Sequence, residues 1–181
     1  MHNTFEKMQE TIKNRIPIHV DLEPNRDEVY SGICLKSNND IFIFICFNEE
    51  SMEFDGFAII RNYEIERYRE WDNEELSEIK KNNYFDFIGK LSLEKMGNMS
   101  ECLTELKNEK LIAIFTESDD DSYFVGKIIS QSKKELEIEL LNEDAEWVGN
   151  EKIKINEITY IGFGTSYEKE LLNKNALRNR V

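Results

Sequence analysis

The chain repeats itself, and this duplication limits the folds open to it more than any other feature. Residues 16–23 align with 110–117, an offset of 94, and the offset then drifts only between 93 and 95. Further matches along the same alignment are Gly32 with Gly126, Gly56 with Gly149, and Glu64-Ile65 with Glu157-Ile158. The drift falls where turns are expected, as it does when two copies of one unit diverge. The sequence therefore predicts two versions of one fold.

Each copy carries helix patterns at both of its ends. Apolar residues at spacings of three and four precede both copies, as Phe5, Met8 and Ile12 and as Met99, Cys102 and Leu106. Such spacing lines one face of a helix. Asn98 followed by Glu101 is typical of an N-cap with its reciprocal partner. Helix starts also follow the copies, at 72–75 and at 165–168. Each unit is predicted to run helix, strands, helix.

The strands within a unit are short. In the second copy, Leu136 to Leu140 alternates strictly between apolar and acidic residues, which indicates a half-buried strand. Four or five such strands fit into about 55 residues at ordinary strand and turn lengths. Because strands this short cannot protect their edges in an open sheet, closure into a small barrel is expected.

The pattern resembles the SH3-like and Sm-like small barrels. The resemblance is carried by Gly126 in the second strand, by the alternating third strand, and by the closing segment 157–161, which 64–68 repeats. It implies a mainly β protein with flanking helices (α+β), built from two duplicated small barrels, each preceded and followed by a short helix. The predicted units are 1–83 and 98–181, joined by a connector at 84–97. Neither copy has an Sm RNA-binding signature or the aromatic set of a proline-binding SH3 groove, so the resemblance implies architecture alone.

The third strand of the first copy, residues 41–47, is apolar on both faces. Ile41, Ile43 and Ile45 align with the inward residues of the second copy, so Phe42, Phe44 and Cys46 are expected to point outward. Such a strip is an association hazard unless it is covered. Its cover is expected to be the connector at 84–88, the other unit or a second chain. Phe42 and Phe44 are therefore partner-binding candidates.

The strong negative charge of the chain makes some classes of binding partner unfavourable. The net charge is −14. Residues 15–72 and 110–168 each hold 13 acidic and 6 basic side chains, so the acidity belongs to the repeated units. This charge disfavours nonspecific binding to nucleic acid or to anionic membranes. No apolar run reaches the roughly 20 residues of a membrane span. Three scattered cysteines and no signal peptide suggest the cytoplasm.

No pattern predicts catalysis, a cofactor or a firm metal site. Asp119, Asp120 and Asp121, with Glu117 nearby, form the densest acidic cluster. Calcium loops use alternating ligands and a glycine, which this cluster lacks. We interpret it as a solvated hairpin tip, with Glu117, Asp119 and Asp121 as weak metal candidates and Asp119 and Asp120 as contacts for a basic partner. Two aromatic residues complete the partner-binding candidates, namely Trp71 and Trp147.

These features favour a non-enzymatic acidic binding or adaptor protein with a protein partner, basic in one version of the hypothesis. The alternative is an inhibitor or immunity-type protein that neutralises a basic target, including a nucleic-acid-binding one. An RNA-binding Sm-like protein and an enzyme with carboxylates between the barrels are lower alternatives. Self-association through the first repeat is a further prediction, whereas membrane binding is not expected.

Overall fold

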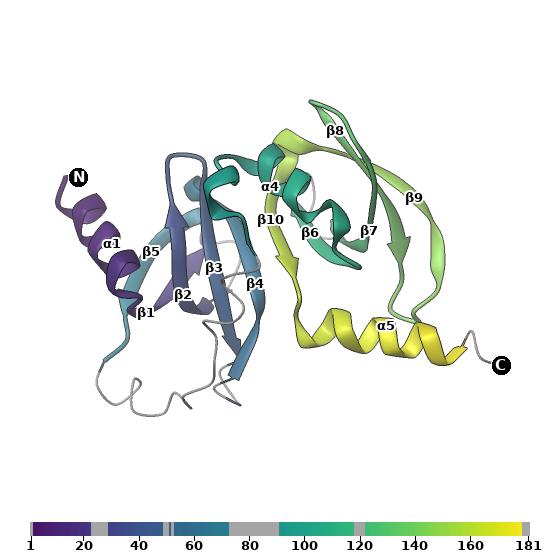
Figure 1. Ribbon diagram of the computed structural model, residues 1–181, viewed down its shortest axis with the longest axis horizontal. Helices are drawn as coiled ribbons and strands as arrows, with labels where there is room; N and C mark the ends of the chain where they lie inside the picture. Colours follow the sequence, from purple (N-terminus) through teal and green to yellow (C-terminus); the bar gives the residue numbers. More distant parts are fainter. Residues whose placement is uncertain are drawn as a thin grey trace.

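The computed structural model describes residues 2–22, 29–48, 51, 53–72, 91–117 and 122–178, with side chains described from residue 8 onward (Figure 1). Its ten strands are β1 Pro17–Leu22, β2 Val29–Ser37, β3 Ile41–Asn48, β4 Glu53–Arg61, β5 Ile65–Glu70, β6 Ile112–Thr116, β7 Tyr123–Gln131, β8 Glu135–Leu141, β9 Trp147–Lys154 and β10 Ile158–Phe163. The described α-helices are α1 His2–Asn14, α4 Met99–Glu105 and α5 Ser166–Arg178. The same described residues contain four short 3-10 helices, η1 Asn62–Glu64, η2 Leu93–Lys95, η3 Leu106–Asn108 and η4 Ile155–Glu157.

All ten strands belong to one antiparallel sheet, in the order β5-β1-β2-β3-β4-β10-β6-β7-β8-β9. The strands β1–β5, here called the first half, and β6–β10, the second half, follow the same internal order. In each half the last strand in sequence lies beside the first, and the other strands follow in turn. The duplication seen in the sequence is therefore repeated in the strand order.

The prediction of two separate barrels, each with a helix before and after it, is wrong. Among the described residues neither half closes on itself, because β4 pairs with β10 of the other half and makes one continuous sheet. The physical reason lies in the two strands themselves. Residues 57–60 of β4 and all of β10 are apolar or small and buried, so each strand covers the other.

The helices also depart from the expected arrangement. Among the described helices, α1 begins the chain, α5 ends it, and α4 leads into the second half. The helix expected to start at 72–75 lies outside the described residues from 73 onward, as does the predicted unit boundary at 83–84. Around α4 the prediction is confirmed, since the Asn98 side chain accepts a hydrogen bond from the backbone N–H of Glu101. None of the described helices is both long and apolar enough to cross a membrane.

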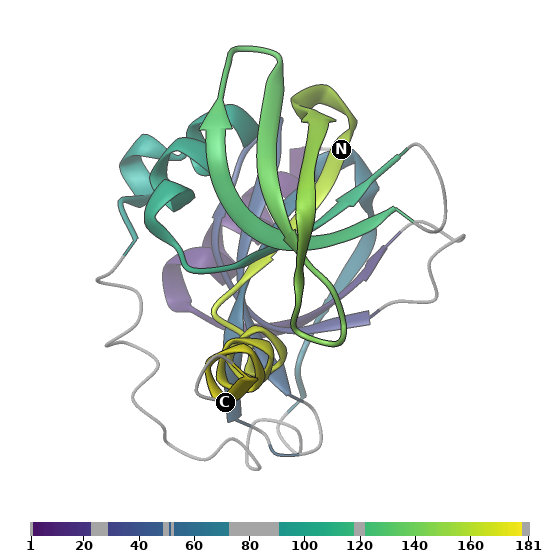
Figure 2. The same cartoon turned by 90° about the vertical axis from the view of Figure 1, so that its right-hand side faces the viewer.

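The core is divided by the faces of the sheet. The largest cluster joins α4 to Ile41, Ile43 and Ile45 of β3 and to the inner face of the second half. A second cluster fills the first half beneath α1, and a third packs β6 and β7 against α5. Figure 1 shows α1 at one end of the molecule, α5 running along the second half, and α4 near the junction, and Figure 2 shows α5 viewed along its axis.

The apolar strip of β3 is covered within the chain. Phe42 and Phe44 are 1% and 0% exposed. They pack with Met8 of α1, with the apolar residues of β1, and with Tyr160 of the second half. Cys46 is half-buried at the border of the same cluster. The expected connector at 84–88 lies outside the described residues, but the other half does contribute to the cover.

Candidate binding groove

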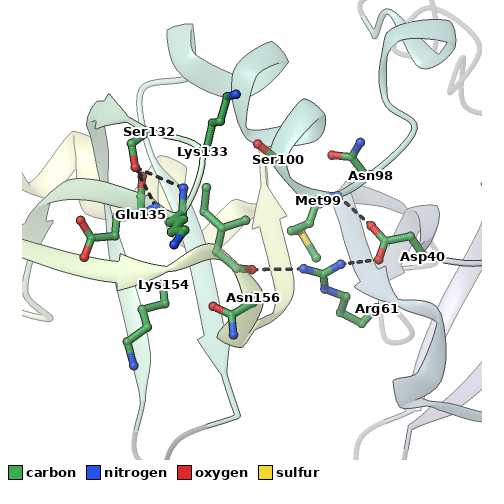
Figure 3. Close-up of a pocket in the computed structure, with 12 residues that line it drawn as sticks. Asp40, Arg61, Asn98, Met99, Ser100, Ser132, Lys133, Glu135, Lys154 and Asn156 are labelled. Carbon is green, nitrogen blue, oxygen red and sulfur yellow. Dashed lines mark hydrogen bonds and ion pairs between the residues drawn. The ribbon is translucent and has the colours of Figure 1, made fainter.

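A groove of about 1010 Å³ opens where the two halves meet (Figure 3). Four structural features line it: the β2–β3 turn with the end of β4, the start of α4, the β7–β8 turn, and the end of β9 with η4. Its lining residues are Asp40, Arg61, Asn98, Met99, Ser100, Ser132, Lys133, Lys134, Glu135, Lys154, Ile155 and Asn156. Equivalent ends of both halves thus face one another across the groove.

Arg61 connects the two halves at this point. Its guanidinium forms an ion pair with Asp40 of the same half. It also donates to the backbone oxygens of Ile155 and Ile158 in the other half, each at 3.1 Å. The Arg61 side chain is only 12% exposed. Because its donors are directed at fixed acceptors, Arg61 acts as a structural link and is not free to bind a ligand.

Asp40 holds the start of α4 against the first half. Its second carboxylate oxygen accepts a hydrogen bond from the backbone N–H of Met99 at 3.1 Å. The neighbouring Asn38 donates from its amide to the backbone oxygen of Gly97 at 2.9 Å. The segment before α4 is thereby fixed to the β2–β3 turn, and this contact forms one wall of the groove.

The opposite wall is the β7–β8 turn. The hydroxyl oxygen of Ser132 accepts the backbone N–H groups of Lys134 at 3.2 Å and Glu135 at 2.9 Å. This local pattern shapes the turn and leaves the side chains of Lys133 and Lys134 exposed. Lys154 pairs with Glu157 at 2.7 Å, and this hydrogen bond raises the pKa of Lys154. Figure 3 shows Lys133 and Lys154 pointing in different directions.

The local charge of the groove opposes the charge of the chain. Its lining holds four basic and two acidic side chains, whereas the whole chain carries −14. Asp40 and Arg61 neutralise each other, and Lys154 is paired with Glu157. Lys133 and Lys134 remain as exposed cations beside the exposed carboxylate of Glu135, and no described residue forms an ion pair with either lysine. The arrangement therefore suits an anionic group.

The groove offers no catalytic constellation among the residues that the structure describes. Its hydroxyls come from Ser100 and Ser132; Ser132 supports its own turn, and Ser100 accepts from the Gln131 amide at 3.1 Å. Its lining contains neither histidine nor cysteine. In the described part of the chain, no group of three or more His, Cys, Asp or Glu side chains is placed to hold a metal ion.

One Ser–His contact lies elsewhere, in the first half. The Ser31 hydroxyl lies 2.7 Å from Nδ1 of His19, and the two residues are register partners in β1 and β2. Ser31 is 3% exposed, and the His19 ring stacks on Trp71 at 5.2 Å between centroids. A substrate cannot reach a hydroxyl buried in this way, so the contact serves packing.

The cysteines are also poor nucleophiles. Cys34 and Cys102 are buried, and all three cysteines are free. Burial raises the pKa of Cys102 to about 12 and raises the pKa of Cys34 further. Since the thiolate is the reactive form, neither thiol is activated.

The residues singled out from the sequence lie outside this groove where the structure describes them. Glu117 accepts a hydrogen bond from the Tyr63 hydroxyl of the first half, and Tyr63 has a pKa raised by burial and then by Glu117. Asp119, Asp120 and Asp121 are outside the described residues. Trp71 is buried against His19 and Phe47, and Trp147 is 38% exposed at the start of β9. Phe42 and Phe44 belong to the core described above.

The groove residues themselves were missed from the sequence. One signal was available, because Arg61 aligns with Lys154 at an offset of 93, so both copies place a basic residue at the end of the fourth strand. Nothing in the alignment says that these two ends face the same space. Comparisons with protein-family models, with curated proteins and with solved structures find no match to this chain.

Proposed function

We propose that this protein is a non-enzymatic binding protein that holds an acidic segment of a protein partner in the groove between its two halves. The observation that carries the proposal is the groove, where exposed Lys133 and Lys134 face an open space in a chain of net charge −14. The described lining is dominated by polar and charged side chains, which supports a role in binding.

A protein segment fits the electrostatics better than a nucleic acid. A long phosphate backbone would extend past the groove over surfaces of a strongly acidic protein, which would repel it. A short acidic peptide segment can confine its charge to the two lysines. Electrostatic complementarity of this kind sets specificity and the rate of association more than the affinity.

A basic target receives less support. Two glutamates of β8 lie opposite lysines of the neighbouring strands, with Glu139 opposite Lys127 and Glu137 opposite Lys152. Opposite charges in such register partners compensate one another. These two glutamates therefore offer little uncompensated charge to a basic target. Three cysteines without a disulfide are consistent with a reducing compartment, and this supports our proposal of a cytoplasmic location.

The test is affinity capture from native lysate with three baits: the wild type, Lys133→Glu/Lys134→Glu, and the control Lys107→Glu/Lys169→Glu. The control makes the same change of charge at two exposed lysines outside the groove. We expect one protein partner with an acidic segment to be retained at low salt by the wild type and the control and lost from the groove variant. Equal retention by all three baits, or retention of nucleic acid alone, would contradict the proposal.

A further inference from the structure

The junction between the halves shows how one unit of this chain pairs with another. Residues Phe57, Ala58, Ile59 and Ile60 of β4 lie opposite Phe163, Gly162, Ile161 and Tyr160 of β10 in antiparallel register. Every one of these residues is buried. The fourth strand of one unit thus pairs with the fifth strand of the next.

The two outer strands of the sheet are the equivalents, in the other half, of the two strands that form the junction. β9 is the fourth strand of the second half, and β5 is the fifth strand of the first half. No described strand pairs with the outer edge of either. Figure 1 shows them at opposite ends of the molecule, so they cannot pair within one chain. The edge that β9 offers corresponds to the edge of β4 that β10 already occupies.

The alignment of the two copies predicts which residues would lie opposite one another if β9 and β5 paired in the same register as β4 and β10. Positions 57–60 correspond to 150–153, and positions 160–163 correspond to 67–70, both at an offset of 93. The carried register places Arg69 opposite Glu151. One residue beyond the observed pairs, it places Glu66 opposite Lys154. Directly opposite residues have Cβ atoms about 5 Å apart, so both pairs bring opposite charges together.

The chemistry of the outer edges differs from that of the junction. Where the junction pairs two small buried residues, Gly162 and Ala58, the edges carry Arg69 and Glu151, both exposed. Charged residues protect an edge strand against indiscriminate pairing. In this register, however, the charges are complementary, so they favour one particular partner while disfavouring others.

We propose that the outer edge of β9 binds the outer edge of β5 of a second copy of this chain, antiparallel and in the register of the β4–β10 junction. The contact joins different surfaces of the two copies, so the association is head-to-tail and continues the sheet from one chain to the next. Because its side chains are polar and exposed, the association is reversible and weakens as salt rises.

Sedimentation velocity over a range of protein concentrations at low and high salt tests this proposal. We expect the wild type to associate at high concentration and low salt. The variants Arg69→Glu and Glu151→Arg should each weaken association at least tenfold, because each sets like charges opposite one another. The double variant R69E/E151R should restore it, and so should mixing the two single variants.

Lys169→Glu and Glu170→Arg are the controls, since they make the same charge changes on the exposed surface of α5. They should leave association unchanged, and circular dichroism should show every variant folded. The mixture of single variants keeps the test informative if the double variant is unstable. A wild type that is monomeric throughout, or association unaffected by R69E, would overturn the proposal. Association of the wild type only with an added peptide would show that a different occupant takes the edge.

Discussion

At the scale of single residues, Arg61 joins the two halves through three contacts of its side chain. It pairs with Asp40 in its own half and donates to two backbone oxygens of the other half. Its counterpart in the second half, Lys154, forms only an exposed pair with Glu157. The two copies thus carry a basic residue at equivalent positions, but only one of these residues connects the halves.

Arg61→Ala should lower the free energy of unfolding by about 2–4 kcal/mol, because it leaves a carboxylate and two backbone oxygens without their charged donor. Urea denaturation measures this change. Lys154→Ala is the matched control, and its denaturation midpoint should stay close to that of the wild type, since exposed pairs contribute little. An equal loss in both variants would show that Arg61 has no special role at the junction.

Glu168 is expected to make the free energy of unfolding depend on pH. The Glu168 side chain caps α5, accepting the backbone N–H of Thr165 at 2.8 Å, and Glu168 is 3% exposed. Burial raises the pKa of Glu168 despite its hydrogen bonds to Thr165. A carboxyl with a raised pKa in the folded state contributes stability that is fully present below its unfolded pKa and is lost as pH rises through its folded pKa.

Glu168→Gln carries no such titration. The free energy of unfolding of the wild type minus that of this variant should therefore fall as pH rises from about 4 to about 7. Denaturation of both proteins at a series of pH values measures the difference, in which the contributions of the other carboxyls cancel. A difference that is constant or grows with pH would contradict the assignment.

At the scale of elements, equivalent positions of the two copies can be compared directly, because one lies at the junction and the other at an outer edge. Gly56 in β4 and Gly149 in β9 are equivalent and both have positive φ, at 81° and 124°. A Cβ at Gly56 would lie 2.7 Å from the backbone oxygen of Phe163, whereas a Cβ at Gly149 would meet nothing within 4 Å. The difference arises because β10 lies against the outer edge of β4, whereas no described strand lies against the outer edge of β9.

Both Gly56→Ala and Gly149→Ala should destabilise the protein through backbone strain of about 1 kcal/mol or more. Gly56→Ala should cost more, because only there does the new methyl group collide with a neighbouring strand. Thermal denaturation of the two variants tests this order. Equal melting temperatures would mean that β10 does not approach β4 as closely as described.

The third strands of the two halves, β3 and β8, are expected to differ in their tolerance of substitution. Phe44→Ala should cost about 3–5 kcal/mol, the usual loss for a buried phenylalanine. Glu139→Lys on the equivalent strand β8 should have a small effect, limited to repulsion from Lys127, which lies opposite it. Chemical denaturation distinguishes the two. Comparable losses would refute the asymmetry in burial between the two third strands.

The strands, their order within each half and the cap of α4 were largely predictable from the sequence. The alignment at an offset near 94 anticipates two sets of strands in the same order, and the Asn98 cap is confirmed. Local patterns specify elements because periodicity and capping act within a few residues of chain. The double-sided apolar character of residues 41–47 also predicted correctly that β3 is covered on both faces.

At the scale of the whole molecule, the sequence was less informative. Apolar residues at 57–60 show that β4 needs cover, but they do not specify which strand supplies it. The equivalent residues of β9 include Asn150, Glu151 and Lys152, and this contrast between copies was the available signal for a junction at β4. The groove was not predictable for the same reason, since it exists only where the ends of the two halves meet.

The junction and the groove both depend on the continuous sheet that the two halves form through β4 and β10. Amide hydrogen exchange, followed residue by residue at low protein concentration, tests it most directly. The amides that link β4 to β10 should exchange slowly, as in the interior of a sheet, while the equivalent outward amides of β9 should exchange fast. Exchange as fast at the junction as at the edge of β9 would contradict the continuous sheet and, with it, the groove between the halves.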